Sequence, residues 1–288
     1  MSSHVSAALA RTLPLLTCPV CGGGLTPKDA QPSVACARGH SFDIAKQGYL
    51  SLLAGGKGAV HGDTADMIAA RARFLDAGHY APIADAVAAY LPAGVIADIG
   101  GGTGYYSSFV LGRLPDAEGL LVDVSVPALR RAAKAHPRLA AIGADVRGTL
   151  PLAPGTCDAT MTIFAPRNPS ELRRVLKPAG RCVFVIPQPA HLRQLRAIVP
   201  GALGIEARKD ETLLAQCDPF FSLVASKDVT YDVDCSDAQV VRDALFMGPT
   251  GHHTTIDDIA EDVAGVSHFT VSVSVYAFEA RYLPSADR

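Results

Sequence analysis

Three cysteines and one histidine near the start of the chain have the spacing of a zinc site. Cys18 and Cys21 form a CxxC, Cys36 follows after fourteen residues, and His40 comes after three more. A CxxC turn directs two thiolates to one point, and fourteen residues suffice for a β-hairpin that returns to it. Structural zinc takes four nitrogen or sulfur ligands in a tetrahedron, so a Cys3His set leaves no position for a reactive water. These four side chains are therefore predicted to bind a structural metal ion.

Two other interpretations of the cluster stay open. A redox CxxC follows a strand and opens a helix, whereas the three glycines at positions 22–24 favour a tight turn. Iron is compatible with the same ligand types. The chain has seven cysteines, an odd number with only three of them clustered, which argues against a disulfide framework.

A glycine-rich loop marks a second site with different chemistry. Asp98-Ile-Gly100-Gly-Gly102-Thr-Gly104 lies between a predicted strand at 95–100 and a predicted helix at 105–112. Glycines let the backbone approach a ligand closely, and the N-terminus of the helix can bind polar groups. The glycines alternate as D-x-G-x-G-x-G, which differs from the dinucleotide pattern G-x-G-x-x-G.

Two further acids follow the next two predicted strands. Asp123 lies 25 residues after Asp98, at the end of a strand at 119–124, where a carboxylate can accept from ribose hydroxyls. Asp145 is the last residue of a predicted strand at 139–145 and is placed for an adenine amino group. The loop and the two acids in this order resemble the class I S-adenosylmethionine (SAM)-dependent methyltransferases. The alternative is an ordinary strand-to-helix turn in an NAD-binding fold.

The elements that must position these residues alternate between strand and helix. Apolar residues at helical spacing predict two helices between residues 63 and 90, with a break at Gly78. Strands then alternate with helices as far as residue 187, which predicts a doubly wound, mostly parallel sheet, the Rossmann-like α/β class. Segments 222–233 and 268–283 alternate apolar and polar residues, as in an antiparallel edge.

The chain is thus predicted to have two modules. Residues 1–55 form a zinc-binding module, and residues 56–288 form a methyltransferase domain with a helical lead-in at 56–92. The small, Gly-rich segment 54–63 suits a flexible connection.

The combination of motifs resembles one family, the large-subunit ribosomal RNA (guanine-N1)-methyltransferases. The resemblance runs from Cys18 to about Leu195, through Gly62-Asp63-Thr-Ala-Asp66-Met67 and Gly78-His79-Tyr80 to the cofactor loop. It implies methyl transfer from SAM to N1 of a guanine in a hairpin loop of 23S rRNA, and some family members confer resistance to macrolides such as tylosin. It also implies a homodimer whose cleft holds the RNA hairpin.

The resemblance also assigns residues. It implies that zinc is held by Cys18, Cys21, Cys36 and His40, and that SAM is contacted by Tyr80, by Tyr106 and Ser107 after the loop, and by His191. The alternatives are a core role for Tyr80 and a capping role for His191. No residue is identified as the proton acceptor for guanine N1.

Two features could serve the RNA. Phe164, after the fourth predicted strand of the domain, could stack on a base. Basic residues that could contact phosphates if they share a face with the zinc module are Arg130, Arg131, Lys134, Arg138, Arg167, Arg173, Arg174, Lys177, Arg181, Arg193 and Arg196. A turn at Phe164 and solvated helix faces are the alternatives.

Composition limits the function classes. Hydrophobic residues make up 49% of the 288 residues and charged residues 19%, as in a globular chain with a sizeable core, and the net charge of −2 gives no overall attraction to nucleic acid. With no signal-peptide pattern and no apolar run near the ~20 residues of a membrane span, we expect a soluble, cytoplasmic protein without a membrane partner. A small-molecule methyltransferase with a zinc-stabilised cap, and a non-catalytic RNA-binding protein that binds SAM, remain alternative functions.

Overall fold

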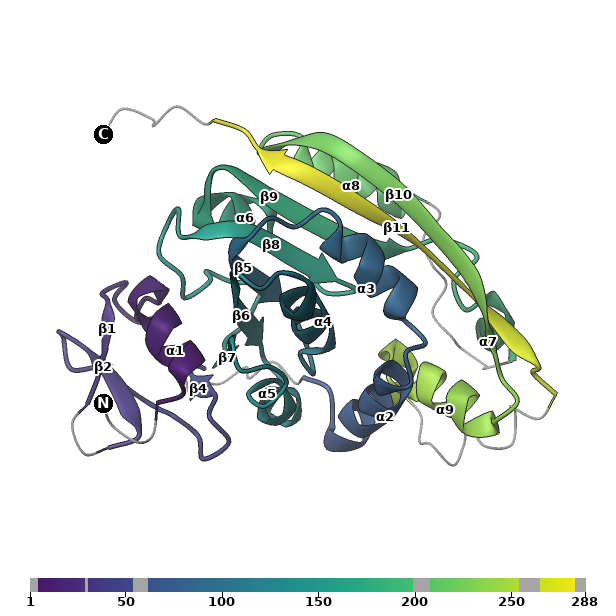
Figure 1. The fold of residues 1–288 in the computed structure, drawn as a ribbon, viewed down its shortest axis with the longest axis horizontal. Coiled ribbons are helices and arrows are strands. Elements are labelled where there is room, and N and C mark those ends of the chain that lie inside the picture. Colours follow the sequence, from purple (N-terminus) through teal and green to yellow (C-terminus); the bar gives the residue numbers. More distant parts are fainter. Residues whose placement is uncertain (1–4, 29–30, 54–61, 199–207, 254–264, 283–288) are drawn as a thin grey trace.

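An eight-stranded mixed sheet forms the centre of the molecule (Figure 1). The computed structural model describes residues 5–28, 31–53, 62–198, 208–253 and 265–282, so most of the predicted connection at 54–63 lies outside the described residues. The strand order is β10-β11-β9-β8-β5-β6-β7-β4. The strands are β4 (Leu50–Ser51), β5 (Gly94–Ile99), β6 (Ala117–Asp123), β7 (Leu139–Gly143), β8 (Cys157–Ile163), β9 (Leu176–Pro187), β10 (Phe221–Asp234) and β11 (His268–Ala280).

The sheet has the predicted fold class. From β9 to β4 all neighbouring strands are parallel, whereas β11 is antiparallel to both β9 and β10. The prediction of a doubly wound parallel sheet with an antiparallel edge is confirmed. The predicted strand at 181–187 begins earlier, at Leu176, because this buried residue pairs with Cys157 of β8.

Helices cover both faces of the sheet. They are α1 (Ala7–Thr12), α2 (Ala65–Asp76), α3 (Ala81–Ala88), α4 (Tyr105–Arg113), α5 (Val126–Ala132), α6 (Pro169–Val175), α7 (Arg193–Ile198), α8 (Lys209–Cys217) and α9 (Ala238–Phe246), with the 3-10 turns η1 (Leu13–Leu15) and η2 (Pro249–His252). None of the helices in the described ranges is long and apolar enough to cross a bilayer.

Strand alternation divides the core into two layers. On β9, Val183 and Val185 face the layer that contains α2 to α5 and α9, whereas Cys182 and Phe184 face the layer of α1, α6 and α8. Successive strand residues point to opposite faces, so a strand buried on both sides reads as a continuous apolar run.

The N-terminal segment forms a small antiparallel sheet beside the main one (Figure 1). Its strands are β1 (Leu25–Pro27), β2 (Ser33–Cys36) and β3 (Ser41–Asp43). We call residues 18–43 the zinc module. Just beyond it, β4 pairs in parallel with β7, and before it Leu16 bridges to Leu152. The N-terminal segment is therefore tied to the main sheet through β4 and to the segment between β7 and β8 through Leu16. A division at residue 55 stays a prediction.

The strand order reverses at β5, which has β6 on one side and β8 on the other. In open α/β sheets, ligands bind at the carboxyl ends of the strands at such a switch point. Asp98 and Asp123 are in the last two positions of β5 and β6, and Phe164 directly follows β8. The fold thus brings the residues selected from the sequence to one edge.

Candidate cofactor and metal sites

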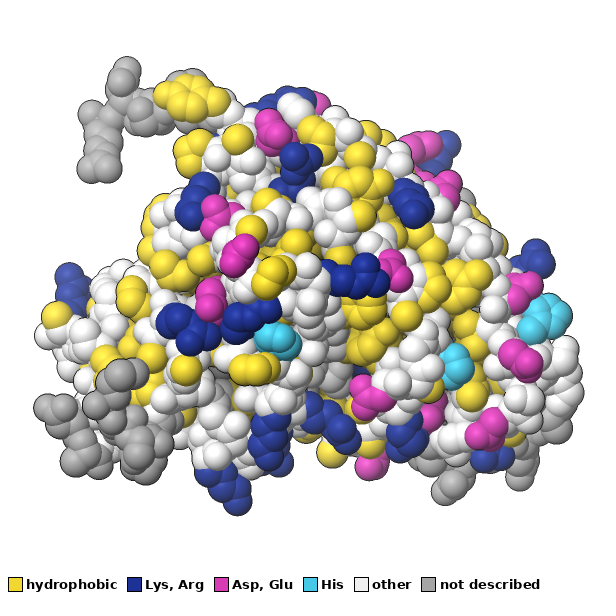
Figure 2. Space-filling model, in the orientation of Figure 1, with side chains coloured by type: hydrophobic (Ala, Val, Ile, Leu, Met, Phe, Trp, Pro, Cys, Tyr) yellow, Lys and Arg dark blue, Asp and Glu magenta, His cyan; other side chains and the backbone are white. Residues whose placement is uncertain are grey.

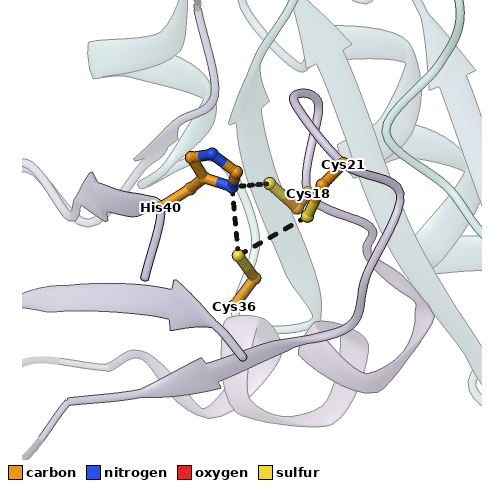
Figure 3. Close-up of side chains that lie close together, drawn as sticks. All are labelled: Cys18, Cys21, Cys36 and His40. Carbon is orange, nitrogen blue, oxygen red and sulfur yellow. Dashed lines mark hydrogen bonds between the residues drawn. The ribbon is translucent and has the colours of Figure 1, made fainter. Parts of the chain in front are cut away.

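The four predicted metal ligands come together at one point (Figure 3). Cys18 and Cys21 lie in the turn before β1, where the N–H of Gly22 donates to the carbonyl of Cys18 at 2.8 Å. Gly22 has φ +72°, a conformation that glycine adopts without strain. Cys36 ends β2 and His40 precedes β3, so the antiparallel β1–β2 pair returns the chain to the CxxC.

The four ligand atoms all lie within 4.8 Å of one another, and three of their six distances are close to those of a tetrahedral metal site. Cys18 Sγ lies 3.6 Å from His40 Nδ1, Cys21 Sγ lies 3.6 Å from Cys36 Sγ, and Cys36 Sγ lies 3.3 Å from His40 Nδ1. A tetrahedron with Zn–S and Zn–N bonds of about 2.1–2.3 Å has edges of roughly 3.4–3.8 Å. This chain's residues can therefore hold zinc, with His40 as an Nδ1 ligand.

The surroundings of Cys36 favour its thiolate form. Burial raises the pKa of the Cys36 thiol. Hydrogen bonds with the backbone N–H groups of Arg38 and His40 and with the side chains of Cys21 and His40 together outweigh that effect and bring the pKa to about 6. Zinc binds the thiolate, so a lowered thiol pKa favours binding near neutral pH.

The glycine loop connects β5 to α4 as predicted. Gly100, Gly102 and Gly104 all have positive φ values, of 75°, 56° and 82°. A Cβ on Gly100 would lie 2.5 Å from the Cβ of Ala165. One on Gly104 would lie 3.1 Å from side-chain atoms of Ala135 and Leu139, and 3.2 Å from the Cα of Ala132 at the end of α5. Glycines adopt this path without strain, and at Gly100 and Gly104 they also avoid close contacts, so the backbone stays close to any ligand above it.

Asp123 is fixed against the glycine loop. Its Oδ2 accepts from the N–H of Gly102 at 2.9 Å, and its Oδ1 accepts from the N–H of Ser125 at 2.8 Å. Each carboxylate oxygen keeps a second lone pair, which is free to accept from a ligand hydroxyl. The carboxylate can thus support the loop and bind ribose at the same time.

Asp98 is wholly buried beneath the loop. Ser107 donates its hydroxyl hydrogen to Asp98 Oδ2 at 2.7 Å. Burial raises the pKa of Asp98 to about 7, helped by the charge of Asp123 and opposed by the Ser107 hydrogen bond. Asp98 and Ser107, predicted as cofactor residues, therefore also join β5 to α4.

The raised pKa of Asp98 predicts a pH-dependent stability. The folded protein binds a proton that the unfolded chain, with an Asp pKa near ~3.9, has released. Stability of the ligand-free protein should therefore decrease as pH rises from about 4 to about 7, by at most ~1.4 kcal/mol per pH unit. Asp98→Asn keeps an acceptor for Ser107 but cannot titrate. Denaturant unfolding gives the free energy of unfolding of both proteins at several pH values. The difference between wild type and variant should show this slope, and parallel plots of the two free energies against pH would contradict it.

Tyr80 and His191, 111 residues apart in the chain, lie side by side. Tyr80 Oη lies 3.4 Å from His191 Nε2, and the N–H of Ser272 donates to His191 Nδ1 at 3.2 Å. The neutral tautomer with hydrogen on Nε2 satisfies both contacts. Burial, followed by the charge of Arg196, lowers the pKa of His191 to about 4, so the ring is neutral at physiological pH.

Phe164 joins this pair from the end of β8. Its ring stacks on that of His191 with centroids 5.6 Å apart, and it lies 5.9 Å from the ring of Tyr80. Phe164 is 41% exposed and has φ +55°, an uncommon value for a residue with a side chain. An exposed aromatic ring held in a strained conformation beside a candidate site is a candidate for function.

The two other predicted cofactor residues differ in their surroundings. Tyr106, on α4, is buried, and its hydroxyl has no hydrogen-bond partner among the described residues. Asp145, just after β7, forms an ion pair with Arg147 and its side chain is 40% exposed. The structure places Asp145 at the same sheet edge as Asp123, at its solvent-exposed side.

Sequence reasoning missed Arg71 as a site residue. This arginine of α2 has its Nη1 3.4 Å from the position that a Cβ would occupy on Gly102. Only the helical position of residue 71 could be read from the sequence, because nothing in the local pattern shows which part of the chain lies over the loop.

Protein groups neutralise part of the predicted basic run. Arg174 pairs with Glu171, Lys177 with Asp158, and Arg181 with Glu279, and Arg138 donates to carbonyls between α4 and β6. Three basic residues on α5 and just after it are exposed and have no ion pair with any described residue. They are Arg130 and Arg131 on the helix and Lys134 beyond its end. Figure 2 shows dark blue side chains along the lower edge of the molecule, where Figure 1 places α5.

Family models match both parts of the chain. The model described as "RlmA, N-terminal", a zinc ribbon, matches residues 16–55, and one described as "Methyltransferase domain" matches residues 96–182. Among solved structures, a chain of the complex between the Haloferax volcanii Trm112 methyltransferase activator and a methyltransferase matches with a TM-score of 0.53 and 18% identity. The match covers 77% of this chain and 100% of the solved chain. At this identity the likeness shows the fold alone.

Two curated relatives match nearly the whole chain. The 23S rRNA (guanine(748)-N(1))-methyltransferase of Streptomyces fradiae is 40% identical over 90% of this chain and 94% of its own length. A protein of Micromonospora griseorubida, named for 23S rRNA (guanine-N1) methylation, is 40% identical over 94% of this chain and 98% of its own. The zinc-ribbon cluster, the methyltransferase fold and these relatives agree, and the chain belongs to the family of zinc-containing, SAM-dependent 23S rRNA (guanine-N1)-methyltransferases.

Proposed function

We propose that this protein transfers the methyl group of SAM to N1 of a guanine in a hairpin loop of 23S rRNA. The observation that carries the proposal is the identity of 40% to the Streptomyces fradiae enzyme over nearly the full length of both chains. The arrangement of the site supports it, because the loop, Asp123, Tyr80 and His191 converge at the edge where class I methyltransferases bind SAM.

The proposed cofactor site has a distinct role for each group. Asp123 accepts from the ribose hydroxyls, Asp145 accepts from the adenine amino group, and Asp98 with Ser107 supports the loop of Gly100, Gly102 and Gly104. Tyr80, Tyr106 and His191 lie next to the bound cofactor. The proposed zinc ligands are Cys18, Cys21, Cys36 and His40.

The chemistry needs alignment and the removal of one proton. Bound SAM supplies a methyl group that its sulfonium charge already activates. Guanine N1 carries a proton that must leave as the methyl arrives. His191 is poorly suited to accept it, because its pKa is about 4 and its Nδ1 already accepts from Ser272. This chain's contribution is then mainly to hold N1 in line with the methyl carbon, and no base is assigned.

The proposed RNA surface joins α5 to the segment that follows the zinc module. A Cβ on Gly48 would lie 4.0 Å from the Cβ of Ala133, at the end of α5, so the turn before β4 packs on this helix. Lys46 is exposed in that turn. Together with Arg130, Arg131 and Lys134 it offers four cations, none of them ion-paired with a described residue, to phosphates. Phosphate contacts fix the position of RNA without reading its sequence.

Primer extension tests the proposal. The protein is incubated with tritiated SAM and unmodified large-subunit rRNA, and the RNA is then copied by reverse transcriptase. We expect label in the RNA and a stop at one hairpin guanine, because N1-methylation blocks base pairing. Label without a stop would indicate another atom. Methyl transfer to a metabolite alone would indicate a small-molecule enzyme, and RNA binding without label would indicate a non-catalytic protein.

Three further properties are part of the proposal. The protein acts in the cytoplasm, where its ribosomal substrate is made, and it acts as a homodimer. Methylation of the rRNA by this protein lowers macrolide binding. The test compares the minimum inhibitory concentration of tylosin for cells with and without expression of the protein.

Phe164→Ala is expected to impair methyl transfer because it weakens binding of the RNA, while binding of SAM is unchanged. Stacking of a base on an aromatic ring contributes about 1–3 kcal/mol, so KM for the RNA should increase by roughly 5-fold to 150-fold while KM for SAM stays the same. Phe164→Tyr should restore most of the activity. Leu223→Ala, at an apolar residue of β10 with 47% exposure, is the matched control. An equal effect of Phe164→Ala on both KM values would contradict the stacking role.

A further inference from the structure

The side chains proposed to contact SAM include no cation. Asp98, Asp123 and Asp145 are acids, the glycines, tyrosines and serine are neutral, and the pKa of about 4 keeps His191 neutral as well. SAM carries an α-carboxylate at its amino acid end. A carboxylate brought out of water next to other acids is destabilised unless a positive charge lies beside it.

Arg71 supplies a positive charge at this place. Its Nη1 lies 3.4 Å from the Cβ position of Gly102, and its side chain is 24% exposed. Burial raises the pKa values of Tyr80, Tyr106 and Asp123, and the charge of Arg71 opposes that rise at all three. The guanidinium therefore lies among the side chains proposed to contact the cofactor.

Two residues hold Arg71 in this position. Asp63 Oδ2 lies 2.5 Å from Nη1, and the carbonyl of Met247, at the end of α9, accepts from Nη2. Asp63 is itself held, because Ser125 Oγ donates to its carbonyl oxygen at 2.9 Å and His252 Nε2 lies 3.2 Å from its Oδ1. A guanidinium has five N–H donors, and Asp63 and Met247 are its only partners among the described residues.

We propose that Arg71 binds the α-carboxylate of SAM, with Asp63 as the residue that positions the guanidinium. This inference rests on the proposed function, since it concerns the same cofactor. A guanidinium can bind a carboxylate through two parallel hydrogen bonds, which fixes the direction of the ligand as well as its affinity. Arg71 would thereby set the position of the methionine chain, and with it that of the methyl group.

The experiment compares two ligands that differ at the amino acid end. S-adenosylhomocysteine carries the carboxylate, whereas 5′-methylthioadenosine has the same nucleoside and sulfur without it. Calorimetry gives the Kd of both ligands for the wild type, for Arg71→Met and for Arg113→Met. The last variant is the control, since Arg113 also pairs with an acid, Asp85, but at the surface. Arg71→Met should weaken the binding of S-adenosylhomocysteine by roughly 10-fold to 150-fold and the binding of methylthioadenosine by less than about 3-fold. Arg113→Met should change neither.

The outcomes separate this inference from the proposed function. An equal loss for both ligands in Arg71→Met would overturn the inference, because Arg71 would then support only the shape of the site. Unchanged binding of both ligands would overturn it too. A wild-type protein that binds neither ligand would instead refute the proposed function. Arg71→Lys, which keeps the charge, should lose less affinity than Arg71→Met and guards against a folding defect.

Discussion

Replacing Cys36 by serine is expected to remove the metal and unfold the zinc module. The three strands β1, β2 and β3 have three or four residues each, too few to fold without further support. Structural zinc contributes about 10–16 kcal/mol to small modules of this kind. Metal content should decrease from about one zinc per chain to a small fraction, and a protease should cleave within residues 18–43.

The same variant should leave the cofactor site intact. The main sheet keeps its own core, and the contacts of β4 with β7 and of Leu16 with Leu152 lie outside the zinc module. Binding of SAM should therefore persist while methylation of rRNA is lost. Cys235→Ser is the control, because Cys235 is a buried lone cysteine whose Sγ donates to the carbonyl of Val233 at 3.6 Å, a bond that serine can also form. A Cys36→Ser protein with a full zinc complement would rule out the proposed ligand set.

Most of the main sheet could be predicted because its strands are buried on both faces. Such strands are continuous apolar runs between glycines and acids, and their alternation with helices then implies a parallel sheet. The two residues of β4 could not be predicted. A strand this short has no periodicity, and only its pairing with β7 identifies it. The same holds for β9, whose first residues are strand because Leu176 pairs with β8.

The candidate site was predictable where its residues share a local pattern. Asp98, the glycine loop and Asp123 follow from strand ends, and the Cys3His set follows from spacing. The contact of Arg71 with Asp63, and that of Asp63 with His252, could not be predicted. His252 is 189 residues from Asp63 and meets it only in the folded chain. The basic run shows the converse limit. Its sequence suggests a phosphate surface, but Glu171, Asp158 and Glu279 neutralise part of it in the folded protein.

Asp123→Asn is expected to weaken SAM binding by at least about 100-fold. The variant loses the charge that strengthens two hydrogen bonds from ribose hydroxyls, each contributing about 1.5–3 kcal/mol. It also leaves one backbone donor without an acceptor, because Gly102 and Ser125 donate to different oxygens of the carboxylate and an amide has only one oxygen. Calorimetry with S-adenosylhomocysteine measures the loss. Asp145→Asn should lose only about 10-fold in affinity for this ligand, since the Asp145 side chain is 40% exposed and already paired with Arg147.

A change of ligand distinguishes ribose binding from support of the loop. The 3′-deoxy form of S-adenosylhomocysteine lacks one of the hydroxyls that Asp123 is proposed to bind. The wild type should bind this analogue roughly 10-fold or more weakly than the parent, whereas Asp123→Asn should bind the two nearly alike, because the partner of the missing hydroxyl is already impaired. If removal of the hydroxyl weakens binding by the same factor in both proteins, the change in the ligand and the change at Asp123 act independently. The carboxylate would then act only on the glycine loop, and the cofactor would have to be oriented by other groups at this edge of the sheet.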